Sequence, residues 1–166
     1  MPEKEKPSLI TIRKGTPDDI PVIKECLIDS WVEHAKQEPE LLDEDRMRAS
    51  KVEDYYQEIF DDPENHFLFV AEKSGEFVGF IRADIREILI FFKHPRILFL
   101  DDTYVKPEFR RKGIAKQLLL KAEEIAKELG IKRIQSRVYT YNKPVQDMLT
   151  SEGYRSPHAT WDKVIG

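Results

Sequence analysis

Alternating apolar and polar residues near the start of the chain predict a strand over 9–15 (LITIRKG). A helix is expected directly after it, because Thr16 is a favourable N-cap and Pro17 suits the first helical position. Asp18 and Asp19 then fall in the first turn, where negative charge complements the helix dipole. Apolar residues recur at helical spacing beyond this point.

A β-hairpin is predicted in the middle of the chain. It follows a second helix, which we expect over 43–60. Two apolar runs at 66–73 and 76–85 flank Ser74 and Gly75, a pair that suits a tight turn. The two runs would therefore pair as antiparallel strands.

The pattern then alternates between strands and helices. A strand is predicted over 97–105, stopped at Pro107, and a helix over 113–129, with Gly130 as its C-cap. The stretch 86–96 fits either an extension of the preceding strand or a loop.

Three more elements complete the predicted order. These are a strand over 131–139, a short helix from just after Asn142 to Gly153, and a last strand over 154–161. The resulting order is β-α-α-β-β-β-α-β-α-β. The strand–helix–strand unit around the helix over 113–129 must be a right-handed parallel crossover. We therefore predict an α/β fold with a mixed sheet and helices on both faces.

Composition limits the alternatives. The 166 residues, 40% hydrophobic and 35% charged, suit one globular domain over 8–166, preceded by a flexible tail over 1–7. A formal net charge of −4 provides no basic field for a nucleic acid. A single cysteine excludes an internal disulfide, and the four histidines lack metal-ligand spacing, so no metal is expected.

Two features bear on location and assembly. The most apolar short run, 88–92 (ILIFF), is far too short to cross a membrane, and the first residues lack the apolar segment of a signal peptide. We therefore expect a cytoplasmic protein with no membrane association. A homodimer is plausible, because residues 88–92 would otherwise be partly exposed.

A basic cluster marks the start of the helix over 113–129. Arg110, Arg111 and Lys112 stand directly before Gly113. The amides of a first helical turn lack partners and lie at the positive end of the dipole, so they bind anions. Basic side chains oppose this dipole, whereas acidic ones would stabilise the helix. The cluster therefore predicts a phosphate site; the alternative is an ordinary helix start with solvated charges.

These residues carry a resemblance to a known family. Arg110, Gly113 and Ala115 match the Arg/Gln-x-x-Gly-x-Gly/Ala motif of the GCN5-related N-acetyltransferases (GNAT). The strand before the motif (FLDDTYV) and the later segment at 142–154 (NKPVQDMLTSEGY) are also similar to that family. A weaker resemblance links LDDTYV to the diamine and polyamine acetyltransferase branch.

The resemblance implies a fold, a cosubstrate and a set of residues. The fold would be that of the acyl-CoA N-acyltransferases, with a mostly antiparallel sheet that splays between two central parallel strands. Amides of the helix start would hold the pyrophosphate of acetyl-CoA, and the preceding strand would pair with its pantetheine arm. The implied cofactor-binding residues are Thr103, Tyr104, Val105, Arg110, Arg111, Lys112, Gly113, Ile114, Ala115, Lys116 and Asn142.

Acetyl transfer to a primary amine requires a base that takes a proton from the amine. Strand alternation would place Asp101 on one face with Thr103 and Val105, and Asp102 on the other. Asp101 is the first candidate base, acting directly or through water, and Asp102 is the second. Either carboxylate could instead bind a cationic substrate, or simply be solvated.

The acid that protonates the leaving thiolate is less clear. The family's usual tyrosine lies seven residues after the asparagine, and Leu149 occupies that position. Tyr139, Tyr141 or Tyr154 could serve instead, or the thiolate could leave unprotonated and take a proton from water. The predicted function is acetyl transfer from acetyl-CoA to a small-molecule amine, a protein N-terminus or a lysine, by direct attack in a ternary complex. The alternative is a catalytically weak acyl-CoA-binding module.

Overall fold

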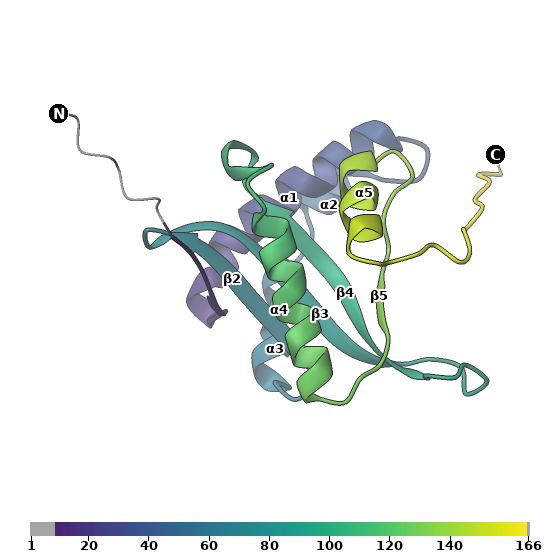
Figure 1. Cartoon of the computed structure of the whole chain (residues 1–166). Helices are drawn as coiled ribbons and strands as arrows, with labels where there is room; N and C mark the ends of the chain where they lie inside the picture. The colour runs from purple at the N-terminus through teal and green to yellow at the C-terminus, as the bar shows by residue number, and fades with distance from the viewer. Residues whose placement is uncertain (1–8, 166) are drawn as a thin grey trace. The chain divides into compact units, whose positions relative to one another are not determined.

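The computed structural model describes residues 9–165 (Figure 1). The predicted tail over 1–7 lies outside the described residues. The described residues form two compact units, 9–27 with Lys51–Ser136 and Ile28–Ser50 with 137–165. Each unit is described by itself below, and the single domain over 8–166 stays a prediction. No helix of the described part is long and apolar enough to span a membrane.

The first unit is built on one mixed sheet. Its strands are β1 (Ile10–Lys14), β2 (His66–Lys73), β3 (Glu76–Glu87), β4 (Arg96–Val105) and β5 (Ile134–Ser136). They lie side by side in chain order, with the first four antiparallel and β5 parallel to β4. The mixed sheet with its parallel crossover confirms the predicted α/β class.

The predicted hairpin is confirmed as β2 and β3. Ser74 and Gly75 both have positive φ, 53° and 82°, as a two-residue turn that follows the twist of the strands requires. The ambiguous stretch 86–96 combines both alternatives: β3 continues to Glu87, and residues 88–95 form no strand.

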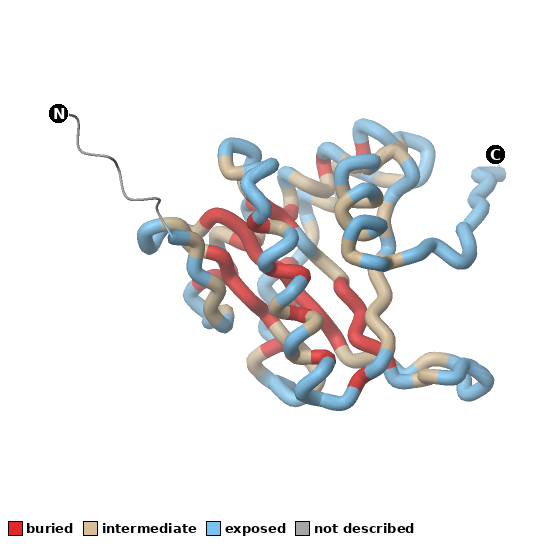
Figure 2. Tube along the Cα trace, in the orientation of Figure 1, coloured by how far each residue is buried: buried red, intermediate tan, exposed pale blue. Residues whose placement is uncertain are grey.

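Helices cover both faces of this sheet (Figure 1). The first unit contains the short 3₁₀ helices η1 (Pro17–Asp19) and η2 (Pro107–Phe109), the first part of α1 (Ile20–Gln37), and the helices α3 (Val52–Asp61) and α4 (Ile114–Glu128). The helix α4 packs across β1 to β4, and α3 packs against β2 on the other face. Figure 2 shows the buried residues concentrated on the central strands and the inner side of α4.

The second unit contains the rest of α1, the short helix α2 (Glu44–Arg48) and α5 (Lys143–Ser151). The predicted helix over 43–60 is therefore wrong as one element, because α2 ends before α3 begins. The Ser50 hydroxyl donates to the Met47 carbonyl at 2.7 Å, a local bond that competes with continued helix.

Two predicted strands also need correction. The strand over 131–139 is reduced to the three residues of β5. The last strand over 154–161 is wrong, because the described residues after 153 form no helix or strand. Pro157 lacks the N–H that a ladder needs, and Trp161 is 93% exposed, so no apolar face is buried there.

Candidate active site

The start of α4 is an uncapped helix N-terminus. Gly113 is the N-cap residue in the left-handed conformation, φ 77°, and no side chain caps the turn. The first helical hydrogen bond runs from the Gln117 amide to the Gly113 carbonyl at 3.1 Å. Helix geometry therefore leaves the amides of Gly113, Ile114 and Ala115 without an intrahelical acceptor. The first turn also carries no acidic residue.

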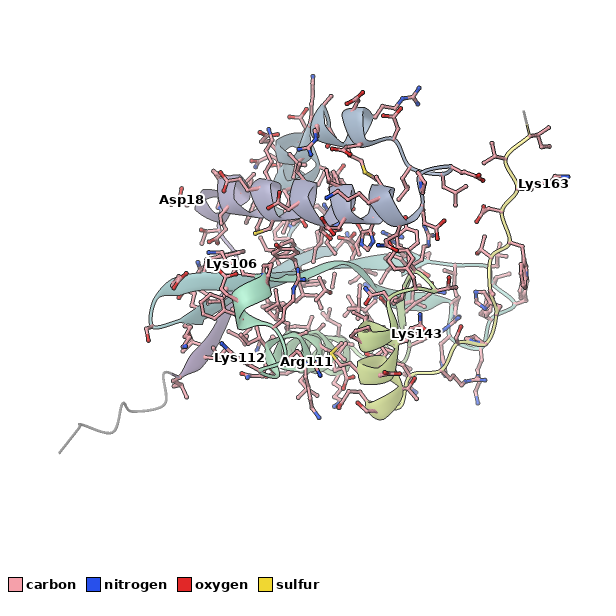
Figure 3. All side chains as sticks on the ribbon, turned by 90° about the horizontal axis from the view of Figure 1, so that it is seen from above. Asp18, Lys106, Arg111, Lys112, Lys143 and Lys163 are labelled. Atoms are coloured by element: carbon pink, nitrogen blue, oxygen red, sulfur yellow. The ribbon has the colours of Figure 1, made fainter. Side chains whose placement is uncertain are left out.

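The basic side chains before α4 differ in what they do. Arg110 Nε donates to the Val105 carbonyl at 2.8 Å, which ties the loop to the end of β4. Lys112 Nζ donates to the Glu108 carbonyl at 3.0 Å. Arg111 is exposed and has φ 60°, in the left-handed region. Figure 3 labels Arg111 and Lys112 at the loop that leads into α4. Two of the three cations thus brace the loop, and all three keep positive charge near the open amides.

The adjacent end of β4 offers backbone groups on its outer edge. The ladder between β4 and β5 stops at the pair Leu100 and Ser136. The Lys106 amide donates to the Val78 carbonyl at 2.9 Å, so the amides of Thr103 and Val105 point away from β3, since alternate residues of an antiparallel strand face opposite neighbours. This edge can accept an extended ligand chain as an added strand.

A β-bulge overturns the predicted faces of the two aspartates. Arg82 pairs with Asp102, but the next residue of β3, Ala83, pairs with Leu100, so Asp101 is the extra residue. The bulge interrupts alternation, and both carboxylates face α3. Asp101 accepts a hydrogen bond from the Tyr55 hydroxyl, and Asp102 accepts one from the Tyr56 hydroxyl at 3.0 Å.

The two carboxylates have different surroundings. Asp101 also pairs with Arg86, whose Nη2 lies 3.2 Å from its Oδ1. Burial, and next to it the negative charge of Asp101, raise the pKa of Asp102 to about 6, against the lowering effect of Tyr56 and Arg82. Asp102 is therefore a carboxylate that can take and release a proton near neutral pH.

The sequence analysis assigned no functional role to Tyr55, Tyr56, Arg82 or Arg86. Tyr55 and Tyr56 belong to a helical pattern typical of core residues, and Tyr56 is indeed fully buried. Their hydroxyls meet β4 at residues 46 positions later. The sequence shows two adjacent tyrosines here, but nothing near them indicates that their hydroxyls bond to the aspartates of β4.

The second unit holds the remaining candidates. Asn142 is the N-cap residue of α5, and Tyr154 follows the helix, its amide donating to the Leu149 carbonyl at 2.9 Å. The Tyr141 hydroxyl contacts His34 Nδ1, and the Tyr139 ring lies 5.3 Å from the Tyr141 ring and 4.7 Å from the His34 ring.

This aromatic cluster of His34, Tyr139 and Tyr141 keeps its groups neutral. Burial, with neighbouring Tyr139 and Glu38, raises the pKa of Tyr141 to about 12. Burial also lowers the pKa of His34. Sequence analysis assigned no role to His34, since nothing in its sequence neighbourhood indicates a partner more than a hundred residues away. Within the described residues, no group of three or more acidic, histidine or cysteine side chains could hold a metal ion.

Comparison with known proteins bears on the family to which the chain belongs. The profile of the acetyltransferase (GNAT) family matches residues 28–154. The uncharacterized N-acetyltransferase YhfO of Bacillus subtilis is 31% identical over 93 residues, which cover 55% of this chain and 61% of that protein. The thialysine N-epsilon-acetyltransferase of Bos taurus is 34% identical over 58 residues, 35% of this chain and 34% of that protein. The chain thus spans only about a third to three fifths of these curated relatives.

A solved structure supports the fold over nearly the whole chain. The aminoglycoside N-acetyltransferase AAC(6')-Iy, solved in complex with CoA, superposes with a TM-score of 0.74 and 20% identity, covering 97% of each chain. At this identity the likeness shows the fold alone. It agrees with the fold predicted from the sequence, and the family profile extends over more than half of the chain. This protein belongs to the GNAT acetyltransferase family.

Proposed function

We propose that the chain transfers an acetyl group from acetyl-CoA to a primary amine by direct attack in a ternary complex. The observation that carries this proposal is the uncapped start of α4, flanked by Arg111 and Lys112 and free of acidic residues in its first turn. Such a terminus favours a multiply charged anion. The pyrophosphate of CoA is the anion that family membership suggests.

Binding would use both the loop and the strand. The amides of residues 111–116 would hold the pyrophosphate. Arg110 would stabilise the loop through its hydrogen bond to the Val105 carbonyl. The outer edge of β4 at Thr103, Tyr104 and Val105 would pair with the pantetheine arm, and Asn142 would bind the same arm. The role of Asn142 rests on the resemblance and on its place as the N-cap of α5.

The chemistry would proceed through a tetrahedral intermediate. Asp102 would accept the proton of the attacking amine, since its pKa of about 6 suits a base at neutral pH. The amine nitrogen would bond to the thioester carbon while the outward amide of Val105 stabilises the oxyanion. The carbon–sulfur bond would then break, and the thiolate would take up a proton.

Two further roles remain to be assigned: that of Asp101, and that of the acid that protonates the leaving thiolate. Asp101 would have to give up its ion pair with Arg86 to accept a proton, so we assign it to positioning the amine rather than to the base. Tyr141 is our candidate acid, since its hydroxyl is protonated at neutral pH; its pKa, raised to about 12, makes it a weaker proton donor than an ordinary tyrosine. Tyr154 is the second candidate.

The test combines binding with turnover. Acetyl-CoA consumption is measured with a panel of thialysine, spermidine, lysine, an aminoglycoside and a peptide with a free N-terminus, alongside thermal stabilisation by CoA. We expect stabilisation by CoA and turnover with at least one amine. An unchanged melting temperature at saturating CoA would overturn the proposal.

One observation favours a second function, acyl-CoA binding with little turnover. Leu149, on α5, occupies the position of the family's usual tyrosine and cannot donate a proton. Stabilisation by CoA without turnover would support this alternative. In that case Leu149→Tyr should create acetylation that the natural chain lacks; if Tyr141 is the acid, the same substitution should leave the rate within a few-fold.

A further inference from the structure

A buried cation lies on the strand next to Asp101 and Asp102. Arg82, in the middle of β3, is 1% exposed. Its Nε donates to Asp84 at 3.1 Å and its Nη1 donates to the Tyr55 backbone carbonyl at 2.8 Å. Its Nη2 also reaches Glu58 at 3.4 Å. The guanidinium is therefore bonded both within its own strand and to α3.

The same guanidinium also packs on both tyrosines. Its central carbon lies 3.6 Å from the centre of the Tyr55 ring and 5.3 Å from that of the Tyr56 ring. A cation over an aromatic face is held by the ring quadrupole. The ring contacts and the bond to the Tyr55 carbonyl together hold residues 55–56 of α3 against the sheet. In this position the Tyr56 hydroxyl donates to Asp102.

Burial of an arginine is unfavourable unless its charge and donors are satisfied. Hydrophobic residues of similar volume would fill the space between α3 and β3 without that penalty. A cation at this place changes the electrostatics of the nearby carboxylate, which a hydrophobic residue would leave unchanged.

We propose that Arg82 and Tyr56 are positioning residues that hold Asp102 as an ionised, correctly oriented base. The inference rests on the proposed acetyl transfer and deepens it. Tyr56 supplies a hydrogen bond to the carboxylate, and Arg82 supplies both a positive charge and the contacts that hold Tyr56 in place. The Tyr55–Asp101 pair, one residue away on each element, orients the neighbouring carboxylate.

The signs follow from the groups that face Asp102. On β4 the neighbouring charge is Asp101, and on β3 the groups are Arg82 and Asp84, with Arg86 paired to Asp101. On α3 they are Tyr56 and, next to Arg82, Glu58. Burial and the two aspartates raise the pKa of Asp102, whereas Tyr56 and Arg82 lower it. Removing either stabilising group should therefore raise this pKa above about 6.

The test compares pH profiles of kcat/KM for the natural chain, Tyr56→Phe and the matched control Tyr55→Phe. Activity should rise with pH as Asp102 loses its proton, near pH 6 in the natural chain. In Tyr56→Phe the midpoint should move up by about one pH unit, which means a roughly tenfold lower rate at pH 5 that recovers at pH 9. In Tyr55→Phe, which faces Asp101, the midpoint should stay in place. A loss of rate at every pH would indicate a structural role and overturn the inference.

The role of the positive charge of Arg82 is tested by comparing a substitution that keeps the charge with one that removes it. Arg82→Lys keeps the cation and should keep the midpoint within about 0.3 units, whereas Arg82→Gln should shift it upward as Tyr56→Phe does. If Arg82→Gln fails to fold, the comparison of Tyr56→Phe with Arg82→Lys decides. A midpoint in Arg82→Lys that moves as far as in Tyr56→Phe would overturn the role of the charge.

A second readout does not depend on turnover. The side-chain carboxyl of Asp102 is titrated by carbon-13 NMR in the CoA-bound chain and assigned with Asp102→Asn. Its midpoint should move up in Tyr56→Phe and stay in Tyr55→Phe, even if no amine is acetylated. An Asp102 midpoint unchanged in Tyr56→Phe would overturn the inference alone, whereas absent CoA binding and turnover would overturn the proposed function. An NMR midpoint that moves while the kcat/KM midpoint does not would show that Asp102 is not the base.

Discussion

Two helix starts in the first unit, η1 leading into α1 and η2 leading toward α4, treat the same physical problem in opposite ways. Before α1, Asp19 accepts hydrogen bonds from the Thr16 amide at 2.8 Å and from both Nη atoms of Arg13 at 2.8 Å. Before α4, Gly113 provides no side chain, and the nearby charges are positive. Each start follows a 3₁₀ turn that contains a proline, but the two differ in charge, in capping and in the conformation of the N-cap residue, which is extended at Thr16 and left-handed at Gly113.

The two helix starts show that the chain satisfies one helix dipole internally and leaves the other for a ligand, at a cost in stability. At the first start the dipole and the amides are satisfied within the chain, and the Asp19 side chain is only 9% exposed. At the second start the amides of Gly113, Ile114 and Ala115 have no intrahelical acceptor, and the cations oppose the dipole. A ligand with several negative charges can accept hydrogen bonds from these amides and pair with the nearby cations. The comparison therefore predicts that changes at one start affect folding and changes at the other affect CoA.

The largest effect is expected for Gly113→Glu. A side chain at this position would carry negative charge into the pyrophosphate site and strain a backbone with φ 77°. We expect CoA affinity to fall at least 100-fold, measured by isothermal titration calorimetry. Gly130→Glu is the matched control: it also has positive φ, 68°, and open space around its Cβ position, but it stands at the other end of α4. Its affinity for CoA should stay within twofold.

Asp19→Asn tests the other side of the comparison. The substitution keeps an acceptor for the Thr16 amide but removes the charge that pairs with Arg13. Burial opposes ionisation of Asp19, yet Arg13 and Thr16 prevail and keep its pKa below the usual value. We expect the free energy of unfolding in urea to fall by about 2 kcal/mol. CoA affinity should be unchanged after correction for the folded fraction, and a tenfold loss would break the comparison.

The pH dependence of this stability has a definite sign. Since the pKa of Asp19 is lowered in the folded chain, its contribution is present at neutral pH and is lost as pH falls through the folded pKa. The gap in stability between the natural chain and Asp19→Asn should therefore close in acid. Urea unfolding at pH 7 and pH 3 measures it; a constant gap would contradict the assignment.

Ala115→Glu separates binding from folding within one substitution. A glutamate in the first turn of α4 complements the dipole, which offsets its slightly lower helix propensity. The free energy of unfolding without ligand should change by less than about 0.5 kcal/mol. CoA affinity should fall about tenfold, because the carboxylate competes with the pyrophosphate for the amides. Equal affinity in the two chains would show that the phosphates bind elsewhere.

The smallest effect is expected for Lys112→Ala. The ammonium donates to the Glu108 carbonyl and is exposed, so it adds only screened attraction. CoA affinity should weaken about twofold to threefold at 0.15 M salt, and the difference should shrink at 0.5 M salt. A loss as large as that of Gly113→Glu would show that cations, rather than amides, carry the site.

Local signals explain what the sequence could predict. The hairpin turn at Ser74 and Gly75, and the start of α4 at Gly113, each depend on residues a few positions apart. The family motif adds the fold, because it fixes one strand and one helix around which the other elements have few arrangements. These features were readable from the printed sequence.

The rest depends on pairings between distant segments. The bulge at Asp101 exists only in register with Arg82 and Ala83, so alternation alone placed the two aspartates on opposite faces. The tyrosine partners of these carboxylates come from α3, and the partner of Tyr141 comes from α1. The break at Ser50 arises from one local hydrogen bond that helical periodicity does not register.

The central claim is that the first-turn amides of α4 bind the pyrophosphate of CoA. The most direct measurement is a titration of the nitrogen-15 labelled chain with CoA, followed by amide NMR shifts. We predict that the largest shifts fall on residues 111–116 and are reproduced by 3′-phosphoadenosine 5′-diphosphate, the nucleotide half of CoA, but not by pantetheine. CoA that binds while these amides keep their positions would contradict the account.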